Sequence, residues 1–389
     1  MSKKSPQLRF EGFTDDWEER KLKELGDIQT GNTPPTSDSD NYSLDGVLWV
    51  TPTDIKSLVI SNTAKKLSQV GVTKARIAKA GSILVTSIAS IGKNTLLRMD
   101  AGFNQQINSL TPTSENDSYF LLTQSEKWSE KMKQTAASAT MQIVNKTDFS
   151  NISTYVPVHK EEQEKIGSFF KQLDDTIALH QRKLDLLKEQ KKGYLQKMFP
   201  KNGAKVPELR FAGVADDWEE RKLENIAQIN KGIQRGKQEI SSVRNELNPY
   251  PVYNGGKKAS GYTDECNREN SVMVSEGGAS AGYVNYYSGK YWSGGHNFTI
   301  SNDTKHDTFF LLYVLQKSQE KLYKLQVGTG LPNIQLKSIK DFPIYSTSNT
   351  EQQKIGSFFK QLDNTIALHQ RKLDLLKEQK KGFLQKMFV

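Results

Sequence analysis

The feature that most constrains this sequence is a 38-residue segment that occurs twice. Residues 162–199 read EQEKIGSFFKQLDDTIALHQRKLDLLKEQKKGYLQKMF, and residues 351–388 repeat them with changes at three positions only. A second block is also duplicated: LRFEGFTDDWEERKL begins at Leu8, and LRFAGVADDWEERKL begins at Leu209. Self-similarity on this scale indicates two copies of one structural unit, each a globular head followed by a long helix.

Apolar residues recur along both long segments at alternating steps of four and three, which is typical of a coiled coil. Eight of the ten seam positions in each copy are apolar, and the other two are a histidine and a lysine. The central apolar seam residues are Ile166, Phe170, Leu173, Ile177, Leu184, Leu187, Ile355, Phe359, Leu362, Ile366, Leu373 and Leu376. We expect the two seams to pack on each other, and a two-fold relation between the copies makes the helices antiparallel.

The heads between these helices contain short β-branched runs bounded by Gly, Asn and Ser, which predict a mainly β core with one or two helices. The expected fold class is therefore α+β, with two similar heads, an antiparallel coiled coil and pseudo-two-fold symmetry. The expected divisions are a first head (1–158), a central helix (159–199), a linker (200–208), a second head (209–347) and a C-terminal helix (348–389). Trp17 and Trp218, which are repeated in the shorter block, are expected to anchor the packing between head and helix.

The composition favours an anionic partner. The formal net charge is +10 and the pI is near 9.2, which predisposes the chain to bind nucleic acid, although a basic surface also serves solubility. The single cysteine, Cys266, excludes an internal disulfide and a cysteine-based zinc site. No apolar run approaches the roughly 20 residues of a membrane span, so we expect a soluble, cytoplasmic protein without membrane contact.

Catalytic motifs are absent from the sequence. Each Gly-Lys pair lacks the upstream glycine of a phosphate-binding loop, and GxGxxG does not occur. The five histidines form no HExxH and no close pair, and no nuclease carboxylate cluster can be defended from spacing. We therefore expect neither catalytic residues, a cofactor nor a metal site in this chain.

Sequence-specific reading of DNA needs amides, hydroxyls and cations against base edges, with further cations on phosphates. Loop segments of both heads have this mixture, although each single residue could equally be an ordinary solvated loop residue. The candidates in the first head are Lys93, Asn94, Asn104, Gln105, Gln106, Gln142, Asn145 and Lys146. Those in the second head are Lys231, Gln234, Arg235, Lys237, Asn254, Lys257, Lys258, Asn285, Tyr286, His296 and Asn297.

The order of motifs resembles one known family. GNTPPT…WVTPTDI (31–55) and FNQQINSL (103–110) occur in the first half, and YPVYNGGK…GYT (250–263) and GTGLPNIQLKSIKDFPI (328–344) occur in the second. With the duplicated helices, this arrangement resembles the specificity (S) subunit of type I restriction-modification systems over nearly the whole chain.

The resemblance implies a non-catalytic DNA-recognition subunit. Each head would be a target-recognition domain for one half of a bipartite, asymmetric sequence. The helices would act as a ruler and dock two modification (adenine methyltransferase) subunits, and restriction subunits would join through them. S-adenosylmethionine, ATP and Mg²⁺ would be bound by those partners.

Two alternatives stay open at this point. The first is a coiled-coil scaffold whose heads bind proteins or glycans, and it differs from a DNA reader in the salt dependence of binding. The second is an S subunit that serves a methyltransferase without any restriction partner. The DNA target, the spacer length and the loops that contact bases cannot be read from the sequence.

Overall fold

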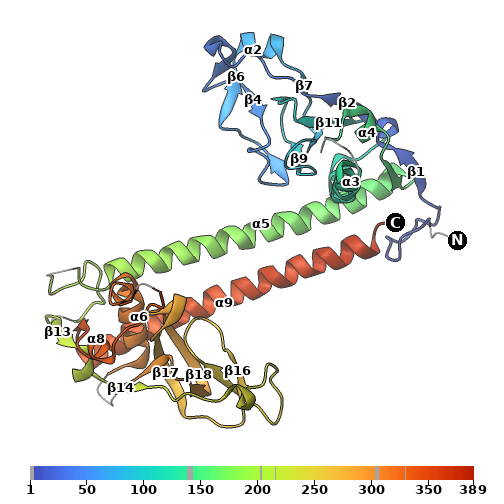
Figure 1. Cartoon of the computed structure of the whole chain (residues 1–389). Helices are drawn as coiled ribbons and strands as arrows, with labels where there is room; N and C mark the ends of the chain where they lie inside the picture. Colours follow the sequence, from blue (N-terminus) through green and yellow to red (C-terminus); the bar gives the residue numbers. More distant parts are fainter. Residues whose placement is uncertain (1–3, 138–142, 202–203, 215, 303–305, 329) are drawn as a thin grey trace. The chain divides into compact units, whose positions relative to one another are not determined.

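The duplicated segments form two long helices, α5 (Lys160–Lys197) and α9 (Asn349–Lys386) (Figure 1). The structure is a computed structural model that describes residues 4–137, 143–201, 204–214, 216–302, 306–328 and 330–389. It consists of a first unit, Met1–Gln181 with Lys372–Val389, and a second unit, Arg182–Arg371. Each unit thus contains a head, the start of the helix that follows it and the end of the other long helix.

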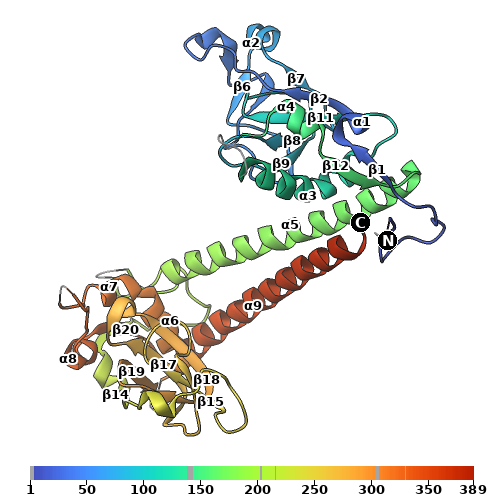
Figure 2. The same ribbon diagram turned by 45° about the vertical axis from the view of Figure 1, so that its right-hand side comes forward.

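The helix segments within the first unit run antiparallel. Phe169 of α5 packs edge-on against Phe383 of α9, with ring centroids 5.0 Å apart, and farther along α5 Asp174 pairs with Lys380. In these contacts the residue numbers rise along α5 as they fall along α9. Both views show the C-terminal end of α9 beside the start of α5 (Figures 1 and 2).

The second unit repeats this antiparallel arrangement. Tyr194 packs against Phe358 with centroids 5.1 Å apart, and Lys191 pairs with Asp363 at 2.6 Å. The predicted antiparallel pairing is therefore confirmed within each unit. Of the predicted seam residues, eight are buried and Leu173, Ile177, Leu362 and Ile366 are half-buried.

A Tyr–Asp–Lys triad joins three elements in the first unit. Tyr119, on the head helix α3 (Ser118–Ala137), donates its hydroxyl to Asp174 Oδ2 at 3.1 Å. Lys380 Nζ lies 2.7 Å from Asp174 Oδ1, and the two side chains are only 16% and 10% exposed. Burial, together with the neighbouring carboxylate, raises the pKa of Tyr119 above its usual value, so the phenol stays a proton donor. A polar cluster at a coiled-coil seam favours one register of the helices, because other registers leave its charges unpaired.

The second unit contains the equivalent triad. Tyr313, on helix α6 (Thr308–Lys317), donates to Asp363 Oδ2 at 2.8 Å, and Lys191 completes the triad with its ammonium 5.1 Å from the Tyr313 ring centroid. Lys191 and Lys380 are the lysines that interrupt the predicted apolar seams. Their place in the seam is explained by these triads, which fix both the helix register and the orientation of each head on its helices.

The first head is built from two five-stranded sheets, in the orders β3-β6-β4-β10-β7 and β2-β11-β8-β9-β5, and a two-stranded ribbon β1-β12. Its strands are β1 (Glu18–Lys21), β2 (Gly26–Thr30), β3 (Tyr42–Ser43), β4 (Val47–Val50), β5 (Val59–Ile60), β6 (Lys65–Leu67), β7 (Ile77–Ala78), β8 (Ile83–Thr86), β9 (Asn94–Leu97), β10 (Ala101–Phe103), β11 (Ile107–Pro112) and β12 (Ser153–Val156). Its other helices are α1 (Leu22–Leu25), α2 (Gln69–Lys74) and α4 (Lys146–Ser150), with a 3₁₀ turn η1 (Ser39–Asn41).

The second head has one six-stranded sheet, in the order β14-β19-β17-β18-β15-β16, and a ribbon β13-β20. Its strands are β13 (Glu219–Lys222), β14 (Ala227–Lys231), β15 (Tyr250–Tyr253), β16 (Gly261–Thr263), β17 (Arg268–Ser275), β18 (Val284–Ser293), β19 (Asn297–Asn302) and β20 (Pro343–Ser346). Its other helices are α7 (Gln319–Tyr323) and α8 (Leu336–Lys340), with 3₁₀ turns η2 (Leu223–Asn225), η3 (Lys237–Glu239) and η4 (Gly278–Ser280).

The two heads share one topology. Strand β18 pairs antiparallel with β17 and, near its end, parallel with β15. In the first head the same pairings are divided between β9, which pairs with β8, and β10, which pairs with β7 and parallel with β4. The first head also carries β5 and α2, which occupy the longer segment between Val50 and Ala78. The prediction of two similar α+β heads is confirmed.

Each head core is completed by the end of the other repeat's helix. In the first unit Trp17 is 1% exposed and packs on Phe120 and Phe388, with centroids 5.7 and 6.0 Å away. In the second unit Trp218 packs in the same way on Phe199 at 5.8 Å. Both tryptophans are therefore the packing anchors that the duplicated block predicts.

The duplicated block is also tied to the start of each long helix. Arg9 donates from Nε and Nη2 to the Glu162 carboxylate at 2.6 and 2.8 Å, and Arg210 binds Glu351 at 2.8 Å through the same two nitrogens. Both glutamates are fully buried, so the bidentate pairing compensates the loss of their hydration.

A glycine near the start of each long helix allows close approach of the head. A Cβ on Gly167 would lie 2.1 Å from Asp117 Oδ1 and 2.9 Å from the Phe120 nitrogen, and Gly356 has the equivalent neighbours in the second unit. Asp117 caps α3 by accepting from the Phe120 N–H at 2.7 Å. Gly193, near the end of α5, has nothing within 4 Å of its ideal Cβ.

These two glycines predict opposite effects of the same substitution. Gly193→Ala is expected to raise the free energy of unfolding by about 0.5–1 kcal/mol, because alanine loses less backbone entropy in a helix. Gly167→Ala is expected to lower it by roughly 1–3 kcal/mol through overpacking against the α3 cap. Denaturant unfolding of both variants measures the difference, and two shifts of the same sign would contradict the packing described for Gly167.

Candidate nucleic-acid interface

The loops that follow β14 and β15 in the second head meet at the β18–β19 turn. Gly232, just after β14, donates its N–H to the Asn297 carbonyl at 2.8 Å. Gly294, in the turn, donates to the carbonyl of Tyr253, the last residue of β15, at 2.9 Å. Three segments that are distant in the sequence are thereby held together by backbone hydrogen bonds.

The first head holds the corresponding loops in the same way. Gly31, just after β2, donates to the Ile107 carbonyl at 3.0 Å, and Asn104 donates to the carbonyl of Val50, the last residue of β4, at 2.9 Å. A Cβ on Gly31 would lie 2.3 Å from the Asn104 carbonyl oxygen, so the close approach requires glycine.

The strand that ends beside these loops completes the equivalence. Ser87 donates its N–H to the Gln106 carbonyl at 2.8 Å in the first head, and Glu276 donates to the His296 carbonyl at 2.9 Å in the second. Gln106 and His296 therefore occupy equivalent positions with different side chains, as do Asn104 and Gly294. We call these loops (31–36, 51–54, 87–93 and 104–106) the first-head loop cluster. Their counterparts (232–236, 254–258, 276–283 and 294–296) are the second-head loop cluster.

Many second-head candidates lie in or beside this cluster. Those with exposed side chains are Lys231, Gln234, Lys237, Lys257, Lys258 and His296. Lys231 Nζ lies 2.7 Å from Glu276 Oε1, and the Glu276 side chain is only 8% exposed, with Oε2 buried and unpaired. Lys257 Nζ lies 5.4 Å from the Tyr283 ring centroid.

Other second-head candidates have structural roles. Asn297 is 1% exposed and donates its amide to Ser293 Oγ at 3.2 Å. Asn285 donates its amide to the Gly256 carbonyl at 3.1 Å and so holds the loop after β15. Tyr286 packs on Phe309 with centroids 5.1 Å apart. Asn254 has a buried Oδ1 without a hydrogen-bond partner.

First-head candidates divide similarly. Gln105 and Gln106 lie in the loop cluster, where Asn104 Nδ2 donates to Thr33 Oγ1 at 3.1 Å and Asn104 Oδ1 accepts from the Gln106 N–H at 2.8 Å. Lys93 is exposed at the β8–β9 turn.

The remaining first-head candidates lie on or near the helices. Asn94 Nδ2 lies 3.4 Å from Ser129 Oγ of α3, and Asn145 caps α4 by accepting from the Asp148 N–H at 2.9 Å. Lys146, the first residue of α4, is exposed, and Gln142 lies outside the described residues.

The structure adds residues that the sequence did not single out. In the first head a hollow of about 350 Å³ is lined by Tyr42, Trp49, Ala64 and Lys65 and by polar side chains of the loop cluster, Thr51 and Asp54 among them. Thr51 donates from both its N–H and its hydroxyl to Asp54 Oδ2, at 2.9 and 2.5 Å. The VTPTD motif in the sequence contains this turn, so the motif could have indicated these residues.

In the second head Trp292 was missed, and it lies against Arg235. The Arg235 guanidinium is 4.5 Å from the Trp292 ring centroid, and Trp292 Nε1 donates to the Ile233 carbonyl at 2.8 Å. An aromatic residue in a strand gives no signal of such a contact, because the same residue type commonly fills cores.

The described residues of the loop clusters supply side chains suited to binding a ligand. Among all the residues that the structure describes, no three His, Cys, Asp or Glu side chains are grouped as a metal site requires. Within the same residues, no helix combines the length and apolarity that crossing a membrane requires. Two loop clusters of one architecture, carrying amides, an imidazole, lysines and an arginine, provide donors and acceptors suited to base edges and phosphates.

Residues 14–189 and 215–378 match the protein family described as the type I restriction modification DNA specificity domain. The chain belongs to this family. Each of the two matches takes in a head and most of the long helix that follows, so the chain carries two specificity domains. The resemblance to type I specificity subunits is confirmed. The description of the family refers to DNA specificity, which agrees with the expectation of a non-catalytic subunit.

Individual relatives agree with the family. The type I restriction enzyme MjaIX specificity subunit of Methanocaldococcus jannaschii is 23% identical over 402 residues, which cover 96% of this chain and 92% of that protein. The type I restriction enzyme HindI specificity subunit of Haemophilus influenzae is 29% identical over 170 residues, or 41% of this chain and 37% of that protein.

Two solved structures share the fold of this chain. The crystal structure of the type I restriction-modification S subunit from M. genitalium has a TM-score of 0.73 at 16% identity, with 99% of both chains covered. A chain from a structure that concerns complex assembly and conformational transition of the type I R-M system has a TM-score of 0.51 at 16% identity, with 97% of this chain and 98% of that chain covered.

Substitution of Gly232, in the loop after β14 of the second specificity domain, is expected to disturb local packing. A Cβ on Gly232 would lie 2.0 Å from the Gly294 carbonyl oxygen. Gly232→Ala is therefore expected to lower the free energy of unfolding by roughly 1–3 kcal/mol. Gly236→Ala is the control, because its φ is −64° and its Cβ would meet only the flexible Gln238 side chain. It should stay within about 0.5 kcal/mol of the unmodified chain in denaturant unfolding. Equal stability of the two variants would contradict the required close approach.

Proposed function

We propose that this chain reads a bipartite, asymmetric DNA target, with residues 1–158 and 209–347 as target-recognition domains for one half-site each. The observation that carries the proposal is the pair of equivalent loop clusters with different side chains. Gln106 stands where the second head has His296, and Asn104 stands where it has Gly294. One architecture with different donors and acceptors suits two different base sequences.

The contacts are assigned to members of the loop clusters and their neighbours, most of which are exposed, although Gln106 is half-buried and the Arg235 side chain is only 9% exposed. The proposed DNA-contacting residues are Lys93, Gln105, Gln106, Lys146, Lys231, Gln234, Arg235, Lys237, Lys257, Lys258 and His296. Asn94, Asn104, Asn145, Asn254, Asn285, Tyr286 and Asn297 are proposed to shape the loops and the sheets behind them.

The long helices are proposed to act as the ruler between the two half-sites. Thirty-eight residues of α-helix extend about 57 Å, which is enough for half-sites about one turn of DNA, roughly 10 bp, apart. The triads support a ruler, since each holds a head, its own helix and the opposite helix in one register within its unit. Bases between the half-sites would then remain unspecified.

Two copies of a modification subunit, an adenine methyltransferase, are proposed to dock on the helices. The duplicated segments 162–199 and 351–388, which form most of the two helices, are identical at 35 of 38 positions, and this suits two copies of one partner. Exposed leucines also repeat at equivalent positions: Leu179 is 61% and Leu368 is 67% exposed, and Leu186 and Leu375 are each 51% exposed. Restriction subunits would join through the modification subunits, and those partners would bind S-adenosylmethionine, ATP and Mg²⁺.

The exposed leucines predict a loss of assembly without loss of folding. Leu179→Glu combined with Leu368→Glu is expected to weaken binding of the modification subunit at least about tenfold, because it places a charge in an apolar contact. The control is Gln196→Glu with Gln385→Glu, which adds the same charge at exposed, equivalent positions of the same helices. Titration calorimetry with the purified partner compares the pairs, and equal weakening by both would count against apolar docking at these leucines.

The proposed function is tested by single-molecule methylation sequencing of DNA. Cells that express this chain with its neighbouring modification subunit are compared with cells that lack the chain. The expected result is a methylated motif of two short half-sites around a fixed gap, lost without the chain. Chain-independent methylation, with the partner bound, would overturn the recognition role.

A scaffold whose heads bind proteins or glycans would bind its partner with little salt dependence. A DNA reader loses affinity steeply as salt rises, because every neutralised phosphate releases counterions. Fluorescence anisotropy across a salt series, with the full chain and a mixed-sequence duplex, separates the two functions.

A further inference from the structure

Arg235 is held by four contacts in the second head. Its guanidinium stacks on Trp292 with the carbon 4.5 Å from the ring centroid, and the side chain is only 9% exposed. Nη2 donates to Asp264 Oδ1 at 2.6 Å, and Nη1 donates to Glu265 Oε2 at 3.1 Å. The Gln234 amide donates to the Arg235 carbonyl at 3.2 Å. These contacts fix the position of both the backbone and the guanidinium group of Arg235.

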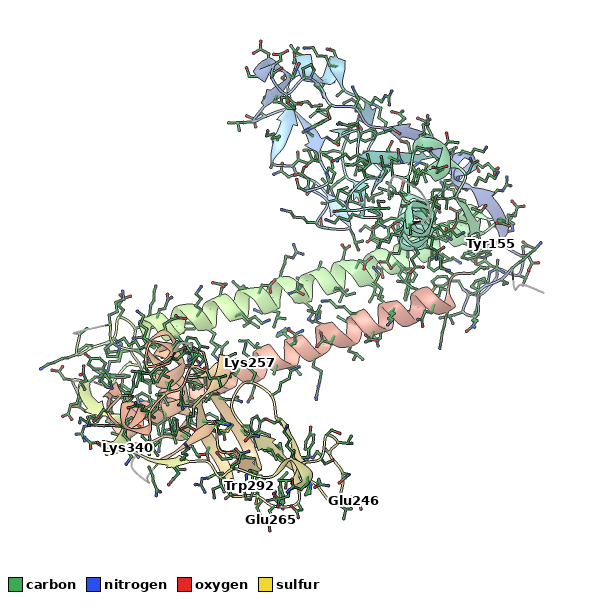
Figure 3. The ribbon with its side chains drawn as sticks, viewed as in Figure 1. Tyr155, Glu246, Lys257, Glu265, Trp292 and Lys340 are labelled. Atoms are coloured by element: carbon green, nitrogen blue, oxygen red, sulfur yellow. The ribbon has the colours of Figure 1, made fainter. Side chains whose placement is uncertain are left out.

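The two acidic side chains lie on the solvent side of this arrangement. The Asp264 and Glu265 side chains are 62% and 68% exposed, whereas the arginine that they bind is buried beneath them. Figure 3 shows Trp292 and Glu265 together at the end of the second head farthest from helix α9. The carboxylates therefore cover the terminal nitrogens of Arg235, which are the atoms that an external ligand would meet.

A guanidinium that lies over an indole, with both terminal nitrogens bound to solvent-exposed carboxylates, is prepared to bind a pair of acceptor atoms. DNA offers two such pairs, namely two phosphate oxygens and the O6 and N7 atoms of guanine. Carboxylate oxygens occupy this position in the present structure. The buried Nε of Arg235 has no hydrogen-bond partner, so the carboxylates satisfy only the outer part of the group.

We infer that Asp264 and Glu265 form an acidic latch that covers Arg235 until DNA displaces it. The inference rests on the proposed function, in which the second head binds DNA. The latch keeps Arg235 stacked on Trp292 and cancels its charge toward solvent, and each carboxylate also repels an approaching phosphate. DNA that presents acceptors in the right place exchanges with the carboxylates, so weak, unspecific contacts are selectively disfavoured.

The latch predicts a specific electrostatic signature. Asp264→Asn with Glu265→Gln removes the competing charges and leaves neutral acceptors beside Arg235. This pair is expected to bind a mixed-sequence duplex roughly fivefold to tenfold more tightly at low salt. The slope of log affinity against log salt is expected to steepen by about 0.9, the value for one additional neutralised phosphate.

The test is a mutant cycle with the full chain, measured by fluorescence anisotropy over a salt series. The acid-neutralising pair is made with Arg235 present and in an Arg235→Ala background, where it should leave the slope unchanged. The matched control is Glu220→Gln with Glu320→Gln, which removes two exposed negative charges of the same head from strand β13 and helix α7. That control should raise affinity less and without the added slope.

The outcomes separate the possible sources of binding. A gain that is equal on a duplex containing only A·T pairs identifies a phosphate as the displacing group, and a gain confined to duplexes with G·C pairs identifies guanine. The same gain in the Arg235→Ala background or in the control pair would overturn the latch, as would weaker binding after the acids are neutralised. Absence of salt-dependent binding by the unmodified chain would instead contradict the proposed function itself.

Discussion

Each head of this protein completes its core with the helix end of the other repeat. Phe388 packs on Trp17 and Phe120 in the first unit, and Phe199 packs on Trp218 in the second. The antiparallel course of the helices and the triads depend on this exchange, because it brings both helices to each head. Burial of apolar side chains at these ends contributes most of the free energy that holds each head on the helices. The polar triads then select one register of the two helices.

The two repeats share nearly the same helices but differ in the loop residues of their heads. The duplicated segments that form the helices differ at three positions only, and the glycines that admit the capped head helices are the same in both copies. The heads keep one topology and one set of backbone hydrogen bonds but change the side chains that those bonds present. Under the proposed function, this separation means that a new target requires new loop residues on an unchanged frame.

Much of the frame could be predicted from the sequence. The four-three spacing of apolar residues determines the helices, and the duplication predicts their pairing. The candidate interface was predicted less completely, because residue type alone does not separate Asn297, whose amide serves the core, from His296 beside it. Trp292 gave no signal, since its role arises from strand pairings that bring it to Arg235. The antiparallel pairing that the sequence predicts brings the end of each long helix to the start of the other. The sequence does not show that the Phe at each of these ends enters a head core.

The exchanged helix ends have a consequence for how the chain folds during synthesis. The first head emerges with its own following helix, yet residues 387–388, which complete its core, are made only after the whole second head. Until then the identical Met198–Phe199 of the same chain, or of a neighbouring nascent chain, competes for that place. Such competition is a route to mispaired or swapped assemblies. The sequence identity of the two helix ends therefore also demands that folding select between two equal partners.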